Sequence, residues 1–333
     1  MHPRCPARID RPTQRRGQHG DYNSQGRSGH ARCPHAAHGA RIIRLVAHHV
    51  GAEAHPGAPR VSAELPGTGE RFEGLLPPVV SAAAFSIRKP AIAVFTLDDY
   101  AAAGIMTSAQ AALLRKAVAE RRNILVAGGT STGKTTLTNA LLAEVAETTD
   151  RVVLIEDTRE LQCKARNLVA LRTKDGVATL SDLVRSSLRL RPDRIPIGEV
   201  RGAEAIDLLK AWGTGHPGGI GTIHAGTALG ALRRLEQLIQ EAVITVPRAL
   251  IAETIDIVAV LAGRGAQRRL AELAMVAGLD PATDDYRVLP SEADGRVPEM
   301  ADDSEESREV ENSAAARRSE ILSAACLTAS DAR

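Results

Sequence analysis

The sequence predicts an α/β protein in which a small α+β domain precedes a larger domain with a mainly parallel sheet. Three patterns lead to this prediction. A glycine-rich loop joins an apolar strand to a helix within NILVAGGTSTGKTT, residues 123–136. Beyond this loop, strand-like apolar runs alternate with helical ones, as in a parallel sheet covered by helices on both faces. Before it, two short strand-like runs flank a turn, which indicates a β-hairpin.

The bulk composition is that of a folded protein without a general affinity for nucleic acids. Of the 333 residues, 44% are hydrophobic and 25% charged, and the net charge is +2. Aromatic residues make up only 2%, which argues against single-strand binding by base stacking, and the balanced charge gives no reason to expect an anionic partner. We therefore expect no direct nucleic-acid contact.

Cysteine usage and hydropathy indicate a cytoplasmic protein. The four cysteines lack C-x-x-C spacing, so neither a disulfide framework nor a closed zinc site is predicted. The N-terminus has no apolar core of a secretory signal, and the longest apolar candidate for a membrane span, residues 75–87, is broken by Pro77 and Pro78. Any membrane association would be peripheral, through partners.

Residues 1–40 differ from the rest of the chain. They are rich in Arg, His, Gly, Gln and Pro, contain no lysine and show no helical or strand periodicity. We expect this segment to be disordered, or non-native sequence from a wrong start or shifted reading frame. A cluster of Cys33, His35 and His38 lacks a fourth ligand at a familiar spacing, so disorder is favoured over a metal site.

Residues 41–97 are expected to form the small α+β domain and a linker. Apolar residues between Ile42 and Val50 suit a short helix, and residues 61–65 and 72–76 flank the turn of the hairpin. A third strand is predicted at residues 85–87, and the linker at 91–99.

Residues 98–290 are expected to form the larger domain. Its first helix begins at Thr107, where T-x-x-Q with Gln110 resembles a capping box. The elements expected after the glycine-rich loop are strands at 151–155, 168–172, 195–197 and 221–223 and helices at 181–190, 203–212, 228–241 and from Pro247. The runs 255–261 and 270–277 then close the domain. From Pro281 onward acidic and small residues predict a solvated tail, with 291–333 as an acidic, disordered end.

The glycine-rich loop fits G-x-x-x-x-G-K-[ST] at every fixed position. Glycines let successive backbone N–H groups point at a phosphate chain, and the following helix presents its positive end to the same anion. Lys134 is expected to reach the β- and γ-phosphates, and the Thr135 hydroxyl to ligate Mg²⁺. The predicted nucleotide-binding residues are Gly128, Gly129, Thr130, Ser131, Thr132, Gly133, Lys134, Thr135 and Thr136.

Polar residues end three further strand-like runs. Glu156 and Asp157 follow the first, Glu199 the second and His224 the third. Because ligands bind at the carboxyl ends of parallel strands, these side chains are expected beside the bound Mg²⁺ and nucleotide. Glu199 is the candidate for orienting the attacking water, unless it merely pairs with Arg201; Glu156 and Asp157 could instead anchor turns.

Four boxes in this order resemble those of the type II/type IV secretion traffic ATPases. They are the glycine-rich loop as Walker A, VLIEDTREL as Asp box, RPDRIPIGEVRG as Walker B and GHPGGIGTIHAG as His box. The likeness covers about residues 41–290. Pro196 departs from regular strand pairing in the Walker B run, since proline cannot donate a ladder hydrogen bond.

The resemblance implies a RecA-like motor domain and a set of roles for the site. Glu156 and Asp157 belong to the Asp box, Glu199 is the Walker B glutamate and His224 is the His-box histidine, with Asp157 holding Mg²⁺ through water. ATP and Mg²⁺ are the implied cofactors, and Glu199, Glu156 and His224 the implied catalytic residues.

The resemblance also implies a hexameric ring that works with inner-membrane components of a conjugation or secretion apparatus. In the family, arginines of the N-terminal domain complete the nucleotide site; Arg60 and Arg71 sit where that pattern looks similar, and Arg88 lies at the linker. Two alternatives stay open: an assembly platform that binds nucleotide with little turnover, and a DNA-translocating motor, which the composition disfavours.

Overall fold

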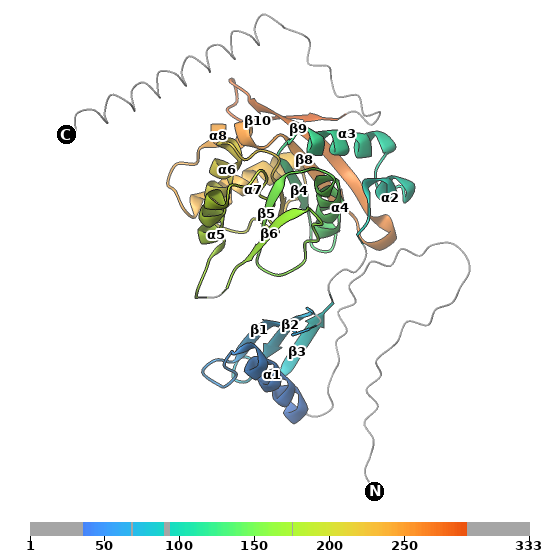
Figure 1. Ribbon diagram of the computed structural model, residues 1–333. Coiled ribbons are helices and arrows are strands. Elements are labelled where there is room, and N and C mark those ends of the chain that lie inside the picture. The colour runs from blue at the N-terminus through green and yellow to red at the C-terminus, as the bar shows by residue number, and fades with distance from the viewer. Residues whose placement is uncertain (1–35, 68, 90–93, 175, 292–333) are drawn as a thin grey trace, which may run out of the picture.

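The computed structural model describes residues 36–67, 69–89, 94–174 and 176–291. These residues form a small N-terminal domain and a larger α/β domain (Figure 1). The predictions for residues 1–35, for the Cys33 and His35 cluster and for the acidic end at 292–333 lie outside the described residues. Within the described ranges, no helix is both long and apolar enough to cross a membrane.

The N-terminal domain packs one helix on a three-stranded antiparallel sheet. Helix α1 (Ala36–Val50) covers strands β1 (Arg60–Glu64), β2 (Arg71–Leu75) and β3 (Ala84–Arg88), which pair in that order. The core comprises Ile43, Ala47, Val61, Phe72 and Leu76. The predicted hairpin and third strand are confirmed. The helix begins at Ala36, before the predicted run from Ile42, so residues 36–40 are helical and the prediction of disorder is wrong for them.

The main sheet of the larger domain is mixed. Its order is β10-β9-β8-β4-β7, with β4 (Ile124–Gly128) parallel to both β7 (Ile220–Ile223) and β8 (Ile257–Ala262). Strands β9 (Arg269–Leu279) and β10 (Tyr286–Pro290) run antiparallel to their neighbours. The sequence predicts the parallel centre but not this antiparallel edge.

Strand β10 corrects the prediction that a solvated tail starts at Pro281. The chain turns back at residues 280–285, where the Asp280 N–H donates to the Asp285 carbonyl (2.7 Å). Tyr286 is buried and packs against the core. Burial of this side chain supplies free energy that the acidic composition of the segment does not reveal.

Strands β5 (Arg151–Glu156) and β6 (Asn167–Arg172) form a parallel pair. Residues 194–197 connect this pair to the main sheet through isolated parallel bridges, including Ile155 to Ile197 and Ile197 to Gly221. The strand predicted at 195–197 is therefore not a regular strand. The Pro196 carbonyl accepts the Ile155 N–H (2.9 Å), but Pro196 has no N–H to return.

Helices cover both faces of the sheet, as predicted. One core lies under α5, α6, α7 and α8, and the other under α2, α3 and α4. The helices are α2 (Leu97–Ala102), α3 (Ser108–Ala119), α4 (Lys134–Ala146), α5 (Leu180–Ser187), α6 (Glu204–Gly213), α7 (Ala228–Gln240) and α8 (Arg248–Thr254), with 3-10 turns η1 (Leu188–Leu190) and η2 (Gly265–Gln267). The capping box of Thr107 and Gln110 is present at α3, and α2 occupies part of the predicted linker.

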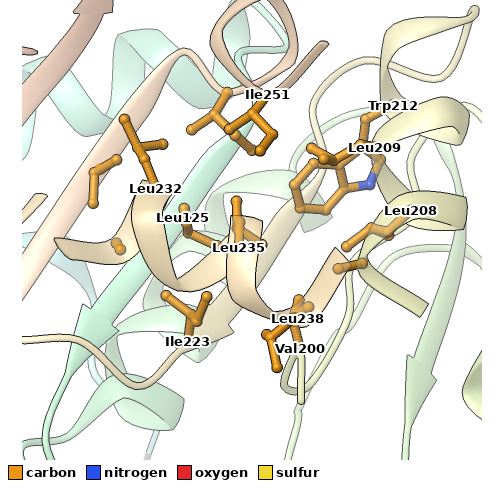
Figure 2. Packing of buried hydrophobic residues seen from close by; sticks show 14 of the residues in the cluster. Leu125, Val200, Leu208, Leu209, Trp212, Ile223, Leu232, Leu235, Leu238 and Ile251 are labelled. Carbon is orange, nitrogen blue, oxygen red and sulfur yellow. The ribbon is translucent and has the colours of Figure 1, made fainter. Parts of the chain in front are cut away.

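The first core includes the indole of Trp212 (Figure 2). Trp212 is buried and donates from Nε1 to the Ile195 carbonyl (2.9 Å). Figure 2 shows it beside Leu208 and Leu209 of α6, whereas Leu232 of α7 lies on the opposite side of the same core. This packing ties α6 to the irregular segment that leads to Glu199.

Candidate nucleotide-binding site

The glycine-rich loop runs from the end of β4 to the first residue of α4. The N-cap of α4 is Gly133, with φ of +97° and no side-chain hydrogen bond to the helix. A Cβ on Gly128 would lie 2.5 Å from Thr132 Oγ1 and 2.8 Å from the Leu261 carbonyl. These glycines let the loop close, and the missing side-chain cap leaves backbone N–H groups of the first turn for an anion.

Lys134 is the first residue of α4, and its side chain folds back onto the loop. Its Nζ donates to the carbonyls of Gly128 (3.0 Å) and Gly129 (3.2 Å) and lies 3.3 Å from His224 Nδ1. Burial lowers the pKa of Lys134, while the negative charge of Glu199 opposes that change. A buried ammonium group held by carbonyls is well placed to exchange them for phosphate oxygens.

His224 connects Lys134 to Glu199. Its Nε2 lies 2.8 Å from Glu199 Oε1. Because the lysine ammonium can only donate, His224 Nδ1 accepts and the Nε2–H donates to the carboxylate. The other Glu199 oxygen pairs with Arg201, whose guanidinium also reaches Asp157 Oδ2 (3.4 Å). The structure therefore brings three predicted residues, Lys134, His224 and Glu199, into one continuous hydrogen-bonded chain.

The Glu156 carboxylate does not face this chain. It is 3% exposed, and its Oε2 accepts the backbone N–H groups of Glu160 (2.9 Å) and Leu161 (3.0 Å). Burial raises the pKa of Glu156, and those two hydrogen bonds oppose the rise. In this structure the Glu156 carboxylate therefore shapes the loop after β5, and its predicted catalytic role stays a prediction.

Glu160 is the acidic group that this loop presents to α4. Thr135 Oγ1 donates to Glu160 Oε2 (3.3 Å), and Asn139 Nδ2 donates to the Glu160 carbonyl (3.3 Å). The sequence reasoning missed Glu160, although it is the second glutamate of VLIEDTREL. Glu160 lies four residues beyond the end of β5, so the rule that ligands bind at strand ends does not single it out. Its side chain faces Thr135 only because the loop folds back.

The two residues predicted to hold the metal ion, Thr135 and Asp157, contact different partners in this structure. Asp157 accepts from Thr173 Oγ1 (2.9 Å) and pairs with Arg201, whereas Thr135 contacts Glu160. Across the described part of the chain, no three His, Cys, Asp or Glu residues are grouped to hold a metal ion. Mg²⁺ in nucleotide sites keeps several waters and needs few protein ligands, so the Thr135 hydroxyl and the Glu160 carboxylate fit it.

Two arginines of the N-terminal domain reach Glu160. Arg88 lies 3.3 Å and Arg71 3.9 Å from its Oε1, and the two face each other across β2 and β3. Arg60 lies at the opposite end of the hairpin, four residues or about 13 Å along the strand from the end that carries Arg71. Arg60 therefore cannot share this carboxylate within one chain.

A further ion pair joins the two domains beside this contact. Arg172 at the end of β6 lies 2.7 Å from Glu64 at the end of β1. These two residues and Arg159 line an open cleft of about 450 Å³ next to the hairpin turn. The loop after β5 and the end of β6 are thus both in ionic contact with the N-terminal domain, through Glu160 and Arg172 respectively.

Comparisons with known proteins place the chain in one family. The profile of the type II/IV secretion system protein family matches residues 37–318. The conjugal transfer protein TrbB of Rhizobium radiobacter is 50% identical over 239 residues, covering 71% of this chain and 74% of that protein. The type IV secretion system protein PtlH of Bordetella pertussis is 38% identical over 256 residues, covering 66% and 75%.

A solved structure agrees with the architecture. The Legionella pneumophila ATPase DotB aligns over 67% of this chain and 63% of its own, with a TM-score of 0.50 and 22% identity, a likeness that concerns the fold alone. The family profile matches most of the described residues. The alignments with TrbB and PtlH cover about three quarters of each relative's own length. On these matches, the chain belongs to the type II/IV secretion system protein family.

Proposed function

We propose that this chain is an Mg²⁺-dependent ATPase with a RecA-like P-loop domain, and that it energises conjugal transfer or type IV secretion. One observation carries the proposal: the loop lysine, the Glu199 and His224 pair, and Glu160 with two arginines of the other domain all converge on the start of α4. Phosphoryl transfer needs this inventory of cations and carboxylates around the phosphates.

The residues divide the work as follows. Lys134 and the loop amides hold the phosphate chain. Thr135 and Glu160 would hold Mg²⁺, which supplies neutralisation of the β- and γ-phosphate oxygens. Glu199 orients the attacking water, and His224 holds Glu199 relative to Lys134. Arg71 and Arg88 bring positive charge from the N-terminal domain to the same phosphates.

Hydrolysis would then act on the relative position of the two domains. Arg71 and Arg88 contact Glu160 across the domain boundary, so a change of phosphate charge changes what these arginines bind. We infer a hexameric ring at the cytoplasmic side of the inner membrane, in contact with membrane components of a secretion apparatus and without direct nucleic-acid contact. Arg60, remote from Glu160 in its own chain, is proposed to serve a neighbouring subunit's site.

The test is the ATP hydrolysis rate per subunit as a function of protein concentration, with Lys134→Ala as the blank. If subunits complete one another's sites, the specific rate rises with concentration. A rate equal to that of the Lys134→Ala blank at all concentrations would contradict the ATPase proposal. A constant rate above the blank would contradict the ring but not the ATPase.

A nucleotide-gated assembly platform is the second candidate. It is favoured by one observation: Arg201 and His224 engage both oxygens of Glu199, which would slow any role of that carboxylate in turnover. Glu199→Gln separates the two functions. A motor loses secretion while retaining ATP binding, with hydrolysis reduced about 10²-fold or more, whereas a platform retains secretion.

A further inference from the structure

Arg268 lies against the glycine-rich loop on the side opposite the Glu199 and His224 pair. A Cβ on Gly133 would lie 2.9 Å from Arg268 Nε, 3.0 Å from Cζ and 3.2 Å from Cδ. Real Cβ atoms essentially never approach to under 3.0 Å, so a side chain at residue 133 would displace the guanidinium from this place. The Nε atom is shielded from solvent, which is unusual for an arginine in a surface turn.

The turn that carries Arg268 is built tightly. It connects β8 to β9 through η2, and a Cβ on Gly263 would lie 2.0 Å from the Gln267 carbonyl. Gly263 also has φ of +76°, a conformation that side chains disfavour. After the turn, the Leu270 N–H donates to the Ile105 carbonyl (2.7 Å). The position of Arg268 is therefore set by backbone geometry on both sides.

The order of strands in the sheet decides which part of a bound nucleotide would lie next to Arg268. Strand β4 lies between β7 and β8, each about 4.8 Å away. His224 follows β7, so the reacting γ-phosphate belongs on the β7 side of Lys134. Arg268 follows β8, so the phosphate chain reaches it at the end that carries the ribose and base. A guanidinium there matches an α-phosphate oxygen by charge and by its forked N–H geometry.

We propose that Arg268 binds the α-phosphate of the nucleotide, and thereby contributes to the affinity for ATP and ADP alike. This inference rests on the proposed nucleotide site. It assigns a ligand contact to the turn between β8 and β9, which lies outside all four sequence boxes. Because ground state and transition state share the α-phosphate, the contact contributes uniform binding rather than catalysis.

The test measures ATP and ADP affinity of the full chain carrying Arg268→Gln. Both nucleotides are expected to bind about 10- to 100-fold more weakly, the range for losing a charge-assisted hydrogen bond. In hydrolysis assays KM should rise by a similar factor while kcat stays within about threefold. Arg269→Gln is the matched control, because Arg269 is exposed, adjacent in sequence and paired across the sheet with Ala262.

Three results would overturn the assignment: unchanged affinity for both nucleotides, an equal loss in Arg269→Gln, or a loss for ATP alone, which would move Arg268 to the γ-phosphate side. If circular dichroism shows that Arg268→Gln does not fold, Arg268→Lys replaces it. Lysine keeps the positive charge but lacks the forked N–H geometry, so the affinities for ATP and ADP should each fall about 3- to 10-fold. If the wild type binds neither nucleotide, the proposed function fails as well; if only Lys134→Ala abolishes binding, this inference alone fails.

Discussion

Replacing Gly219 by alanine should destabilise the α/β domain through the indole of Trp212. A Cβ at this position would lie 2.0 Å from Cε2, 2.2 Å from Nε1 and 2.4 Å from Cδ2 of Trp212. Gly219 cannot retreat, because its carbonyl accepts the Ile124 N–H and its own N–H donates to Asn123 Oδ1. The buried indole must therefore move.

The magnitude follows from two losses. Forcing an extra methyl group into a close-packed core costs about 1 to 3 kcal/mol. Moving the indole also breaks its hydrogen bond to the buried Ile195 carbonyl, and leaving that carbonyl unpaired costs about 1 to 3 kcal/mol. We expect Gly219→Ala to lower the free energy of unfolding by about 2 to 6 kcal/mol, a large share of the ~5 to 15 kcal/mol typical of a domain.

Chemical denaturation followed by tryptophan fluorescence measures this directly, because Trp212 is the sole tryptophan and reports on the α/β domain alone. Gly226→Ala is the control: it is exposed, and its added Cβ would meet nothing within 4 Å. That variant should stay within about 0.5 kcal/mol of wild type. A Gly219→Ala protein as stable as the control would refute the packing argument.

Three further predictions concern the loop after β5. Glu156→Gln should keep the ATPase rate within about threefold, because the amide oxygen can still accept the two backbone N–H groups. Glu160→Gln should lower the ATPase rate about 10²-fold or more. Equal losses of rate in a steady-state assay would support a direct role for Glu156. Burial raises the pKa of Glu156 above its usual 4.5, so its contribution to stability is present below that pH and is lost as pH rises through the folded-state pKa. Unfolding free energies measured from pH 4 upward should therefore depend less on pH in Glu156→Gln, and an unchanged profile would contradict this. Arg88→Ala should change thermal stability by less than about 1 kcal/mol, because its ion pair is half-exposed, yet lower the ATPase rate at least about tenfold; a normal rate would remove Arg88 from the site.

Local signals predicted most of the secondary structure. The threonine and glutamine of the α3 capping box, the glycines of the glycine-rich loop and the alternation around the hairpin each act within a few residues. Such features are decided by backbone conformational preferences and short-range hydrogen bonds, which the sequence displays directly. The exceptions were segments stabilised from a distance, such as β10, whose Tyr286 is buried by helices far away in the chain.

The candidate site was predictable in its parts but not in its contacts. Strand ends identified Lys134, Glu199 and His224 as neighbours, because parallel strands present their carboxyl ends at one edge. The sequence could not show in the same way whether Glu156 or Glu160 faces Thr135. Both follow the same strand, and the backbone N–H groups that capture Glu156 become available only when the loop folds back on it.

By itself, the sequence determined the glycine-rich loop, the order of the elements and the set of charged residues available to the site, since these depend on short-range patterns. The tertiary structure alone decided which carboxylate faces Thr135, that Arg71 and Arg88 rather than Arg60 reach it, and that Arg268 lies on Gly133. Those contacts join residues far apart in the chain. Their distances are set by sheet order, domain packing and glycine-permitted close approach, which have no local signature in the sequence.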